Sequence, residues 1–456
     1  MLIEMEKVIE MKMNHLKKWT VGALSTAMVA SSVLFAPAAS AAVEPITVDA
    51  KAAFVIDNET NKILFNQNGD ESLGIASMTK MMSIYLVLEA IEAGQINWDT
   101  QVPISSYALG ISQDYELSNV PFRVDFTYTV KDLYEAMLIY SANGASIAMA
   151  ELIAGSEADF VDMMTAKLDE WGVTDYSIYN STGLPNYYAD QYGELYPGAA
   201  TDTENHMTAR GVAVVADHLL DDYPEIIETS SIVEKTFMEG SEDEINMLTY
   251  NYMLPGMIYY RENVDGLKTG TTDDSGASFT GTAVENDMRI ITVLIGATDN
   301  ETRFMETSRL MDFAFDNFEK VTVIENGSAV ETEGTIAVAK GKEEEVGLIY
   351  GNDLTVVTPI AEDRQIDTDL TLNKDLLNED GMVEAPIEKG TVVGKVAVSI
   401  EGDDLGYLGS QSDEVSVAVA TTVEKANAFA LAWRWIASTT AKGWNAVTDF
   451  VTGFFN

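Results

Sequence analysis

The stretch GIASMTKMMSIYLVLEAIEAG, residues 74–94, has the apolar content of a helix buried in a protein core. Lys80 is unusual in this setting, because lysine is rarely buried without a partner. It stands three residues after Ser77, and residues i and i+3 lie on the same face of a helix. The sequence therefore predicts one helix over 74–94 in which the Ser77 and Lys80 side chains touch.

A contact between these two residues would give the serine a base. A serine hydroxyl is a poor nucleophile until a base takes its proton. The chain has only three histidines, His15, His206 and His218, and none lies near Ser77 in sequence. We expect His206 and His218 to be surface or packing residues. Burial lowers the pKa of a lysine, so Lys80 is the candidate base. Alone, a Ser-x-x-Lys sequence is a weak signal.

Two further segments strengthen this interpretation. YSANGAS places Ser-Ala-Asn at 141–143 between two helical patterns, and VDGLKTGTT places Lys-Thr-Gly at 268–270 on a predicted strand. Ser-x-x-Lys, Ser-x-Asn and Lys-Thr-Gly together are the motifs of penicillin-binding proteins and class A β-lactamases. With these motifs the chain resembles the low-molecular-mass penicillin-binding proteins that are D-alanyl-D-alanine carboxypeptidases, and the resemblance covers nearly its whole length.

The resemblance implies a role for each motif side chain. Ser77 would attack the carbonyl between the two terminal D-alanines of a peptidoglycan stem peptide, and Lys80 would accept its proton. Ser141 and Lys268 would relay a proton to the departing D-alanine, and Asn143 would hydrogen-bond the substrate's amide. β-Lactam antibiotics would acylate the same serine and act as inhibitors. No cofactor and no metal are implied.

The family also implies groups that bind the substrate's oxygens. The oxyanion hole would be formed by the backbone N–H of the nucleophile and of Thr271. An arginine after the strand that follows Lys-Thr-Gly would bind the free carboxylate, and Arg303 stands at this place, with Arg309 as the weaker candidate. Thr269 would add a hydroxyl to the same carboxylate, and Gly270 completes the substrate-binding strand.

Other functions use the same residues. A β-lactamase would need a deacylating glutamate after Ser-x-Asn, and Glu151, Glu157 and Glu170 stand in no segment that resembles such a loop. A peptidoglycan D,D-endopeptidase of the same superfamily would act on crosslinks with the same groups. A non-catalytic wall-binding protein would have a degenerate site, whereas all motif residues are intact here. In YNSTGLPN, Asn180 and Gly183 are interpreted as structural.

Composition excludes several classes of site. The 456 residues contain no cysteine, so disulfides and Cys-ligated metals are absent. The 73 Asp and Glu against 27 Lys and Arg give a formal charge of −46, which repels nucleic acid. The charge indicates a solvated acidic surface, and adaptation to a salty or alkaline exterior is a hypothesis within that interpretation.

The first 41 residues have the pattern of a signal peptide. Lys17 and Lys18 precede the apolar run WTVGALSTAMVASSVLFAPAA, and Ala-Ser-Ala at 39–41 is a cleavage signature. We expect cleavage after Ala41 and an exported, extracytoplasmic protein. Retention of the run as a membrane anchor is the alternative.

The remaining chain divides into three predicted parts. Residues 45–319 have strand patterns at both ends, a hairpin at 52–68 and three strands at 263–298, with helices between. They predict an α/β (α+β) domain of the β-lactamase/penicillin-binding-protein transpeptidase type, whose sheet joins both ends. Residues 102–130 are predicted as loops and short strands. Residues 321–423 predict a small all-β sandwich domain.

Residues 424–456 form the third part. Apolar residues recur there every three or four positions, which predicts an amphipathic helix, and the members of the stripe are Phe429, Trp433, Ile436, Thr440, Trp444, Val447, Val451 and Phe454. Lys425, Arg434 and Lys442 make this segment locally basic. We expect it to lie on the outer face of the cell membrane as a peripheral anchor. The alternative is a helix packed on its own domain.

Overall fold

The computed structural model describes residues 43–44, 46–242, 244–331, 334–361, 366–400, 405–409 and 413–434. The predicted signal peptide lies outside these residues, and so does the predicted tail helix after residue 434. Within the described ranges, no helix combines the length and apolar character needed to cross a bilayer.

A five-stranded sheet lies at the centre of the first part of the chain. Its order is β10-β11-β12-β1-β2, with the strands β1 (Ala52–Asp57), β2 (Ile63–Gln67), β10 (Val264–Thr272), β11 (Gly276–Glu285) and β12 (Met288–Ala297). β1 pairs antiparallel with β12, with Ala52 opposite Ile295. The predictions of a hairpin at 52–68, of three strands at 263–298 and of a sheet joining both ends are therefore confirmed. Every residue of β1 is buried, so both faces of the sheet are covered.

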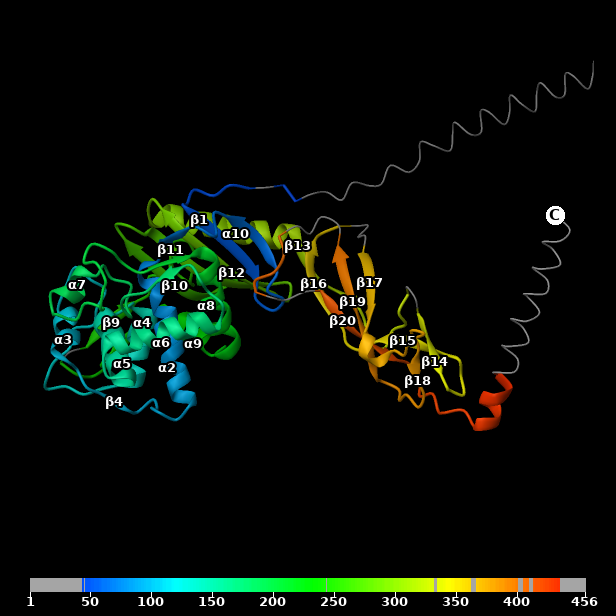
Figure 1. The fold of residues 1–456 in the computed structure, drawn as a ribbon. Helices are drawn as coiled ribbons and strands as arrows, with labels where there is room; N and C mark the ends of the chain where they lie inside the picture. The colour runs from blue at the N-terminus through cyan, green and yellow to red at the C-terminus, as the bar shows by residue number, and fades with distance from the viewer. Residues whose placement is uncertain are drawn as a thin grey trace, which may run out of the picture. The chain divides into compact units, whose positions relative to one another are not determined.

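Helices from the middle of the chain pack beside this sheet, where Figure 1 shows α2, α4, α5 and α6 gathered together. The helices are η1 (Ala76–Thr79), α2 (Lys80–Glu92), α3 (Ser106–Ser112), α4 (Val130–Ile139), α5 (Asn143–Ala154), α6 (Glu157–Glu170), α7 (Tyr187–Asp190), α8 (Ala209–Asp222), α9 (Ile226–Ser230) and α10 (Asn300–Asn317). Short strands complete this part: β3 (Ser72–Gly74), β6 (Tyr176–Ser177) and β7 (His206–Thr208) in one sheet, β4 (Gln101–Val102) with β5 (Tyr128–Thr129), and β8 (Glu234–Phe237) with β9 (Ile245–Leu248).

Two sequence predictions in this region are wrong in detail. Residues 74–94 do not form one helix: η1 is a 3-10 turn, and α2 begins only at Lys80. Ala76 at the start of η1 has a φ of 45°, a left-handed conformation that a regular helix does not contain. Residues 102–130 include a helix, α3, which begins where the Ser105 side chain accepts the Ala108 N–H at 3.0 Å.

The prediction of two helical segments around residue 141 is confirmed. α4 begins with a capping box, in which the Thr129 hydroxyl accepts the Asp132 N–H and the Asp132 carboxylate accepts the Thr129 N–H. α5 begins at Asn143. The break between these helices leaves Ser141 outside both, with a φ of 56°.

The last part of the chain is all-β. A two-stranded sheet, β13-β16, and a six-stranded sheet, β17-β19-β20-β15-β14-β18, share one hydrophobic core. The elements are β13 (Phe318–Ile324), β14 (Thr335–Ala339), β15 (Glu345–Tyr350), β16 (Leu354–Pro359), β17 (Ile366–Leu372), η2 (Lys374–Leu376), β18 (Val383–Glu384), β19 (Val392–Ile400) and β20 (Glu414–Val419). Alternating buried and exposed residues along β19 produce the two-sided pattern that predicted a sandwich.

The beginning of the predicted tail is described as well. A helix covers residues 428–434. Arg434 donates to the backbone carbonyls of Gly341 at 2.7 Å and Lys342 at 2.6 Å, so part of the predicted basic patch is tied to the β domain. Phe429 and Trp433 lie four residues apart, and their exposed fractions are 81% and 65%.

Candidate active site

Lys80 stands at the first position of α2 with its side chain fully buried. Its Nζ lies 3.0 Å from Ser77 Oγ, 2.7 Å from Asn143 Oδ1 and 2.8 Å from the Thr182 carbonyl oxygen. The predicted contact between serine and lysine is therefore present, although it is made across the junction of η1 and α2.

These three neighbours fix the orientation of a neutral amine. Asn143 Oδ1 and the Thr182 carbonyl can only accept hydrogen bonds, so they take both N–H groups of an uncharged lysine. The remaining lone pair then faces the Ser77 hydroxyl. The arrangement is that of a general base beside a nucleophile.

Burial is the main reason that the pKa of Lys80 lies well below the ordinary lysine value. The positive charge of Lys268 lowers the pKa further, and the negative charge of Glu157 opposes both. The expected buried setting of Lys80 is confirmed, and burial favours the neutral form of a lysine.

Ser141 and Lys268 face each other from different elements. Lys268 lies on β10. Its Nζ donates to Ser141 Oγ at 2.9 Å and to the carbonyl of the next residue, Thr269, at 3.0 Å. Both side chains are buried. Burial, and then the charge of Arg303, lower the pKa of Lys268 to about 7. This pair can therefore hold or release a proton near neutral pH.

Asn143 links the two halves of the site. Its Oδ1 accepts from Lys80, while its Nδ2 donates to the Ser118 carbonyl at 3.0 Å. Both ends of the amide are thus bound within the protein. The predicted bond from Asn143 to a substrate amide stays a prediction.

Lys-Thr-Gly runs along β10, next to the turn that carries the nucleophile. A Cβ atom added to Gly270 would lie 2.8 Å from the Ile75 carbonyl oxygen and 3.2 Å from the Ala76 Cβ. Only glycine lets β10 approach η1 this closely. Thr269 is buried, whereas Thr271 is exposed at the end of the strand. The oxyanion role of the Thr271 N–H is compatible with this neighbourhood and stays a prediction.

Arg303, from the first turn of α10, reaches the same strand. Its Nη1 donates to the Gly270 carbonyl, to Thr271 Oγ1 and to the Ser278 carbonyl, each at 3.1 Å, and its Nη2 donates to Asn300 at 2.7 Å. The buried Nε has no partner among the described residues. Arg309 instead pairs with Glu306 at 2.6 Å and is 49% exposed. The structure thus brings Arg303, and not Arg309, to the Lys-Thr-Gly strand.

Asn180 and Gly183 shape the loop that supplies the Thr182 carbonyl. Asn180 Oδ1 accepts the N–H groups of Thr182 at 3.1 Å and Gly183 at 2.7 Å. Gly183 has a φ of 77°, and a Cβ there would lie 1.8 Å from the Ala76 carbonyl oxygen. The interpretation of both residues as structural agrees with these contacts. The sequence did not reveal that their loop contributes a carbonyl to the lysine.

The histidines have other partners. His218 stacks on Trp171, with ring centroids 4.3 Å apart, and His206 Nε2 lies 3.0 Å from an Asp274 carboxylate oxygen. Neither contacts Ser77 or Lys80, as expected. Among the described residues, no group of three His, Asp or Glu is arranged to hold a metal ion.

A cavity of about 900 Å³ opens beside Thr271. Aromatic and acidic side chains dominate its lining, which comprises Glu116, Leu117, Leu184, Pro185, Tyr187, Tyr188, Asp202, Thr203, Glu204, His206, Thr271, Thr272, Asp273 and Asp274. The cavity gives an extended ligand room next to the strand of the Lys-Thr-Gly motif.

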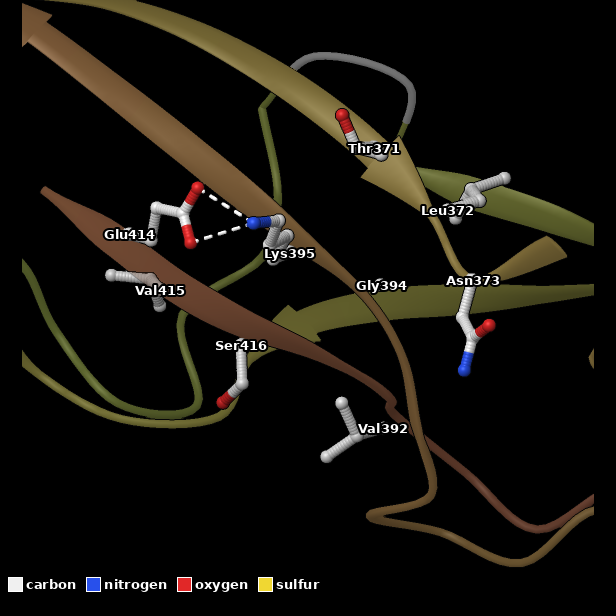
Figure 2. A pocket seen from close by; sticks show the side chains of 9 residues that line it. All are labelled: Thr371, Leu372, Asn373, Val392, Gly394, Lys395, Glu414, Val415 and Ser416. Atoms are coloured by element: carbon white, nitrogen blue, oxygen red, sulfur yellow. Dashed lines mark hydrogen bonds and ion pairs between the residues drawn. The ribbon is translucent and has the colours of Figure 1, made fainter. Parts of the chain in front are cut away.

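A second pocket, of about 530 Å³, lies in the β domain between β17, β19 and β20 (Figure 2). Its charged groups neutralise each other, because Lys395 donates to both carboxylate oxygens of Glu414, at 2.7 and 2.8 Å. None of the residues predicted for catalysis or binding lines this pocket.

Comparison with known proteins agrees with both parts of the chain. A family model described as D-alanyl-D-alanine carboxypeptidase matches residues 38–299, and one described as penicillin-binding protein 5, C-terminal domain, matches residues 318–425. The D-alanyl-D-alanine carboxypeptidase DacC of Escherichia coli (strain K12) is 30% identical over 408 residues, which are 88% of this chain and 92% of that protein.

Solved structures are similar too. The chain matches a peptidoglycan synthesis regulatory factor (PBP3) from Streptococcus pneumoniae at a TM-score of 0.68 and 37% identity, over 83% of this chain and 100% of that one. It also matches penicillin-binding protein D2 from Listeria monocytogenes in its cefotaxime-bound form, at a TM-score of 0.50 and 28% identity, over 60% of this chain and 99% of that one.

Proposed function

Because this chain belongs to the D-alanyl-D-alanine carboxypeptidase family, we propose that it removes the terminal D-alanine from peptidoglycan stem peptides through an acyl-enzyme on Ser77. It is a serine-type carboxypeptidase. The observation that carries the assignment to Ser77 is the fully buried Lys80, whose lone pair faces the Ser77 hydroxyl when two obligate acceptors hold its N–H groups.

The acylation step uses the two lysines in different ways. Ser77 Oγ bonds to the carbonyl carbon between the two D-alanines while its proton passes to Lys80. The tetrahedral intermediate then expels the amine of the last D-alanine, which takes a proton supplied through Ser141 and Lys268. The 2.9 Å contact between these two side chains supports that relay. Water finally hydrolyses the ester, and Ser77 regains its proton.

Arg303 is proposed to bind the free carboxylate of the substrate. Its guanidinium is buried against the end of the Lys-Thr-Gly strand, where three oxygen atoms of the protein share Nη1. A positive charge held at this place attracts the terminal carboxylate of the peptide. Thr269 adds a hydroxyl on the same strand.

We propose in addition that β-lactams acylate Ser77. The support is the similarity to a penicillin-binding protein solved with cefotaxime bound. A β-lactam carbonyl would be attacked by the same serine, with the same lysine as base.

The location is also a proposal. A signal peptide over 1–41 would export the protein, and residues 424–456 would hold it on the outer face of the membrane. Phe429 and Trp433, both largely exposed and on one helical face, support an interfacial helix. Deleting 428–456 should release the protein from washed membranes, and Ile258→Ser, at another exposed apolar site, should not. Retention of the truncated protein on membranes would contradict the anchor.

The first experiment is intact-mass spectrometry of the purified chain with a penicillin, alongside a separate digestion of a peptide ending in D-alanyl-D-alanine. A stable adduct on Ser77 and release of one D-alanine are expected. Rapid turnover of the penicillin with an intact peptide would instead indicate a β-lactamase. Cleavage of a crosslinked dimeric peptide in preference to the linear one would indicate an endopeptidase.

A further inference from the structure

Glu157 is a buried carboxylate without a role in the motifs. It is the first residue of α6, and its side chain has no ion pair within 4 Å among the described residues. Its Oε1 accepts the Ser181 N–H at 2.9 Å and the Ser181 hydroxyl at 2.6 Å, and its Oε2 accepts the Tyr107 hydroxyl at 2.9 Å. Three donors therefore bind this carboxylate, whose burial would be unfavourable without hydrogen bonds.

The backbone segment that Glu157 binds also contacts Lys80, the proposed base. The Ser181 carbonyl accepts the hydroxyls of Ser83 at 2.6 Å and Ser146 at 2.8 Å. The next carbonyl, that of Thr182, accepts from Lys80 at 2.8 Å. A shift of this segment would remove one of the two acceptors that orient the neutral lysine.

Glu157 also acts on Lys80 through its charge. The positive charge of Lys268 lowers the pKa of Lys80, and the negative charge of Glu157 opposes that decrease. Around Glu157 itself lie the hydroxyl of Tyr107 and the carboxylates of Glu151 and Glu194. Burial raises the pKa of Glu157, and the hydrogen bonds from Ser181 and Tyr107 oppose that rise.

We propose that Glu157 is a positioning residue for acylation, which fixes the Thr182 carbonyl against Lys80 and places one buried carboxylate close to that lysine. The inference rests on the proposed function, in which Lys80 is the base. It assigns Glu157 no contact with substrate and no part in deacylation.

Two substitutions separate the two effects. Glu157→Gln keeps the volume and an acceptor for the Ser181 N–H, but removes the charge. Glu157→Ala removes both. Glu151→Gln is the matched control, because Glu151 is a half-buried glutamate of the same region that does not bond to Ser181. Thermal unfolding checks that each variant is folded.

The direct readout is an NMR titration of lysine labelled with ¹³C at Cε, with the Lys80 signal assigned by its loss in Lys80→Met. Removing a negative charge lowers the pKa of a nearby lysine, so Glu157→Gln should move the Lys80 titration to lower pH by on the order of one unit. Lys268 should titrate as before, and Glu151→Gln should leave both unchanged. An unchanged Lys80 titration in Glu157→Gln, or an equal shift in Glu151→Gln, would overturn the electrostatic role.

The rate of acylation by a penicillin tests the positioning role. At the optimum pH of each protein, Glu157→Ala should be acylated about tenfold more slowly than Glu157→Gln, since only the alanine variant loses the hold on Ser181. Equal acylation rates in Glu157→Ala and Glu157→Gln would contradict the positioning role. A wild-type protein that forms no adduct would contradict the proposed function itself. Normal wild-type acylation, with equal rates in Glu157→Ala and Glu157→Gln and an unchanged Lys80 titration in Glu157→Gln, would contradict only this inference.

Discussion

Arg303 and Arg309 lie six residues apart on one helix and have different environments. Arg303 is buried against the Lys-Thr-Gly strand, whereas Arg309 pairs with Glu306 at the surface. Replacing Arg303 with Gln should lower kcat/KM for a peptide ending in D-alanyl-D-alanine by about 10- to 100-fold, because a charge-assisted bond to the carboxylate is lost. Arg309→Gln is the matched control and should act like the wild type.

The substrate supplies the second control for this prediction. A peptide with an amidated C-terminus offers no carboxylate, so the Arg303→Gln variant and the wild type should cleave it at similar low rates. Steady-state kinetics with both peptides measure the discrimination. If Arg303→Gln retained the full preference for the free carboxylate, another cation would have to bind it.

Lys268 leads to a prediction about pH. Its pKa is lowered to about 7, first by burial and then by Arg303. A lysine that supplies a proton must be charged, so the acylation rate should fall as the pH rises through this value. Lys268→Arg should remove this alkaline decline, because a guanidinium stays charged, and it should lower the rate, because a guanidinium does not release its proton. Stopped-flow acylation by a penicillin between pH 5 and 10 measures both profiles.

The control for the pH profile is Lys395→Arg, which changes an exposed lysine of the β domain paired with Glu414. Its profile should match the wild type. If the acylation rate of Lys268→Arg still fell above pH 7, the titration of another group would have to cause the alkaline decline.

At the scale of elements, the loop 180–183 and the turn η1 depend on one glycine. Gly183→Ala should destabilise the protein by roughly 3–5 kcal/mol, since a Cβ at φ 77° would lie 1.8 Å from the Ala76 carbonyl oxygen. The displaced loop should also slow acylation by a penicillin. Gly193→Ala is the matched control, because its φ is 74° with nothing within 4 Å. It should cost only about 1–2 kcal/mol, the price of the left-handed backbone.

Urea unfolding of both variants, together with their acylation rates, tests this prediction. A Gly183→Ala protein as stable and as active as Gly193→Ala would mean that the contact with Ala76 relaxes without consequence. That result would also weaken the argument that the loop positions the Thr182 carbonyl.

Periodic patterns explain which elements could be predicted. The strands β10, β11 and β12 and the helices α4 and α5 have long apolar patterns and clear ends, and they were predicted correctly. The helix α3 is short and contains Gly110, which is unfavourable within a helix. Gly110 packs against the ring of Tyr192, and no local sequence pattern indicates this contact. The 3-10 turn η1 in place of a first turn of α2 has no local signal either, and it lies against Gly270 of β10.

The same reasoning applies to the site. Ser77, Lys80, Ser141, Asn143 and Lys268 were found because their motifs fix residue types at fixed spacing, and the structure brings them together. The Thr182 carbonyl was not found, since any residue has a carbonyl. The sequence gives no signal for the role of Glu157, because an acidic residue at the start of a helix is ordinary. Its role depends on which distant backbone it meets.

At the scale of the whole molecule, the two parts of the chain differ in what they can do. The first part holds the buried lysines, the nucleophile and a cavity beside Thr271. The pocket of the β domain has a neutralised ion pair and none of the predicted site residues (Figure 2). Chemistry is therefore assigned to the first part alone, and the β domain carries the tail that is proposed to meet the membrane.

The formal charge of −46 leads to the last prediction. So large a net charge destabilises the compact state through self-repulsion, and salt weakens this repulsion because the Debye length falls from about 30 Å at 0.01 M to about 3 Å at 1 M. The melting temperature of the protein should therefore rise by several degrees, roughly 5 °C, between these salt concentrations. Equal increases in sodium chloride and tetramethylammonium chloride would identify screening as the cause. A melting temperature that stays constant in both salts would show that repulsion between the acidic side chains does not destabilise the protein. That result would contradict the hypothesis of adaptation to a salty exterior.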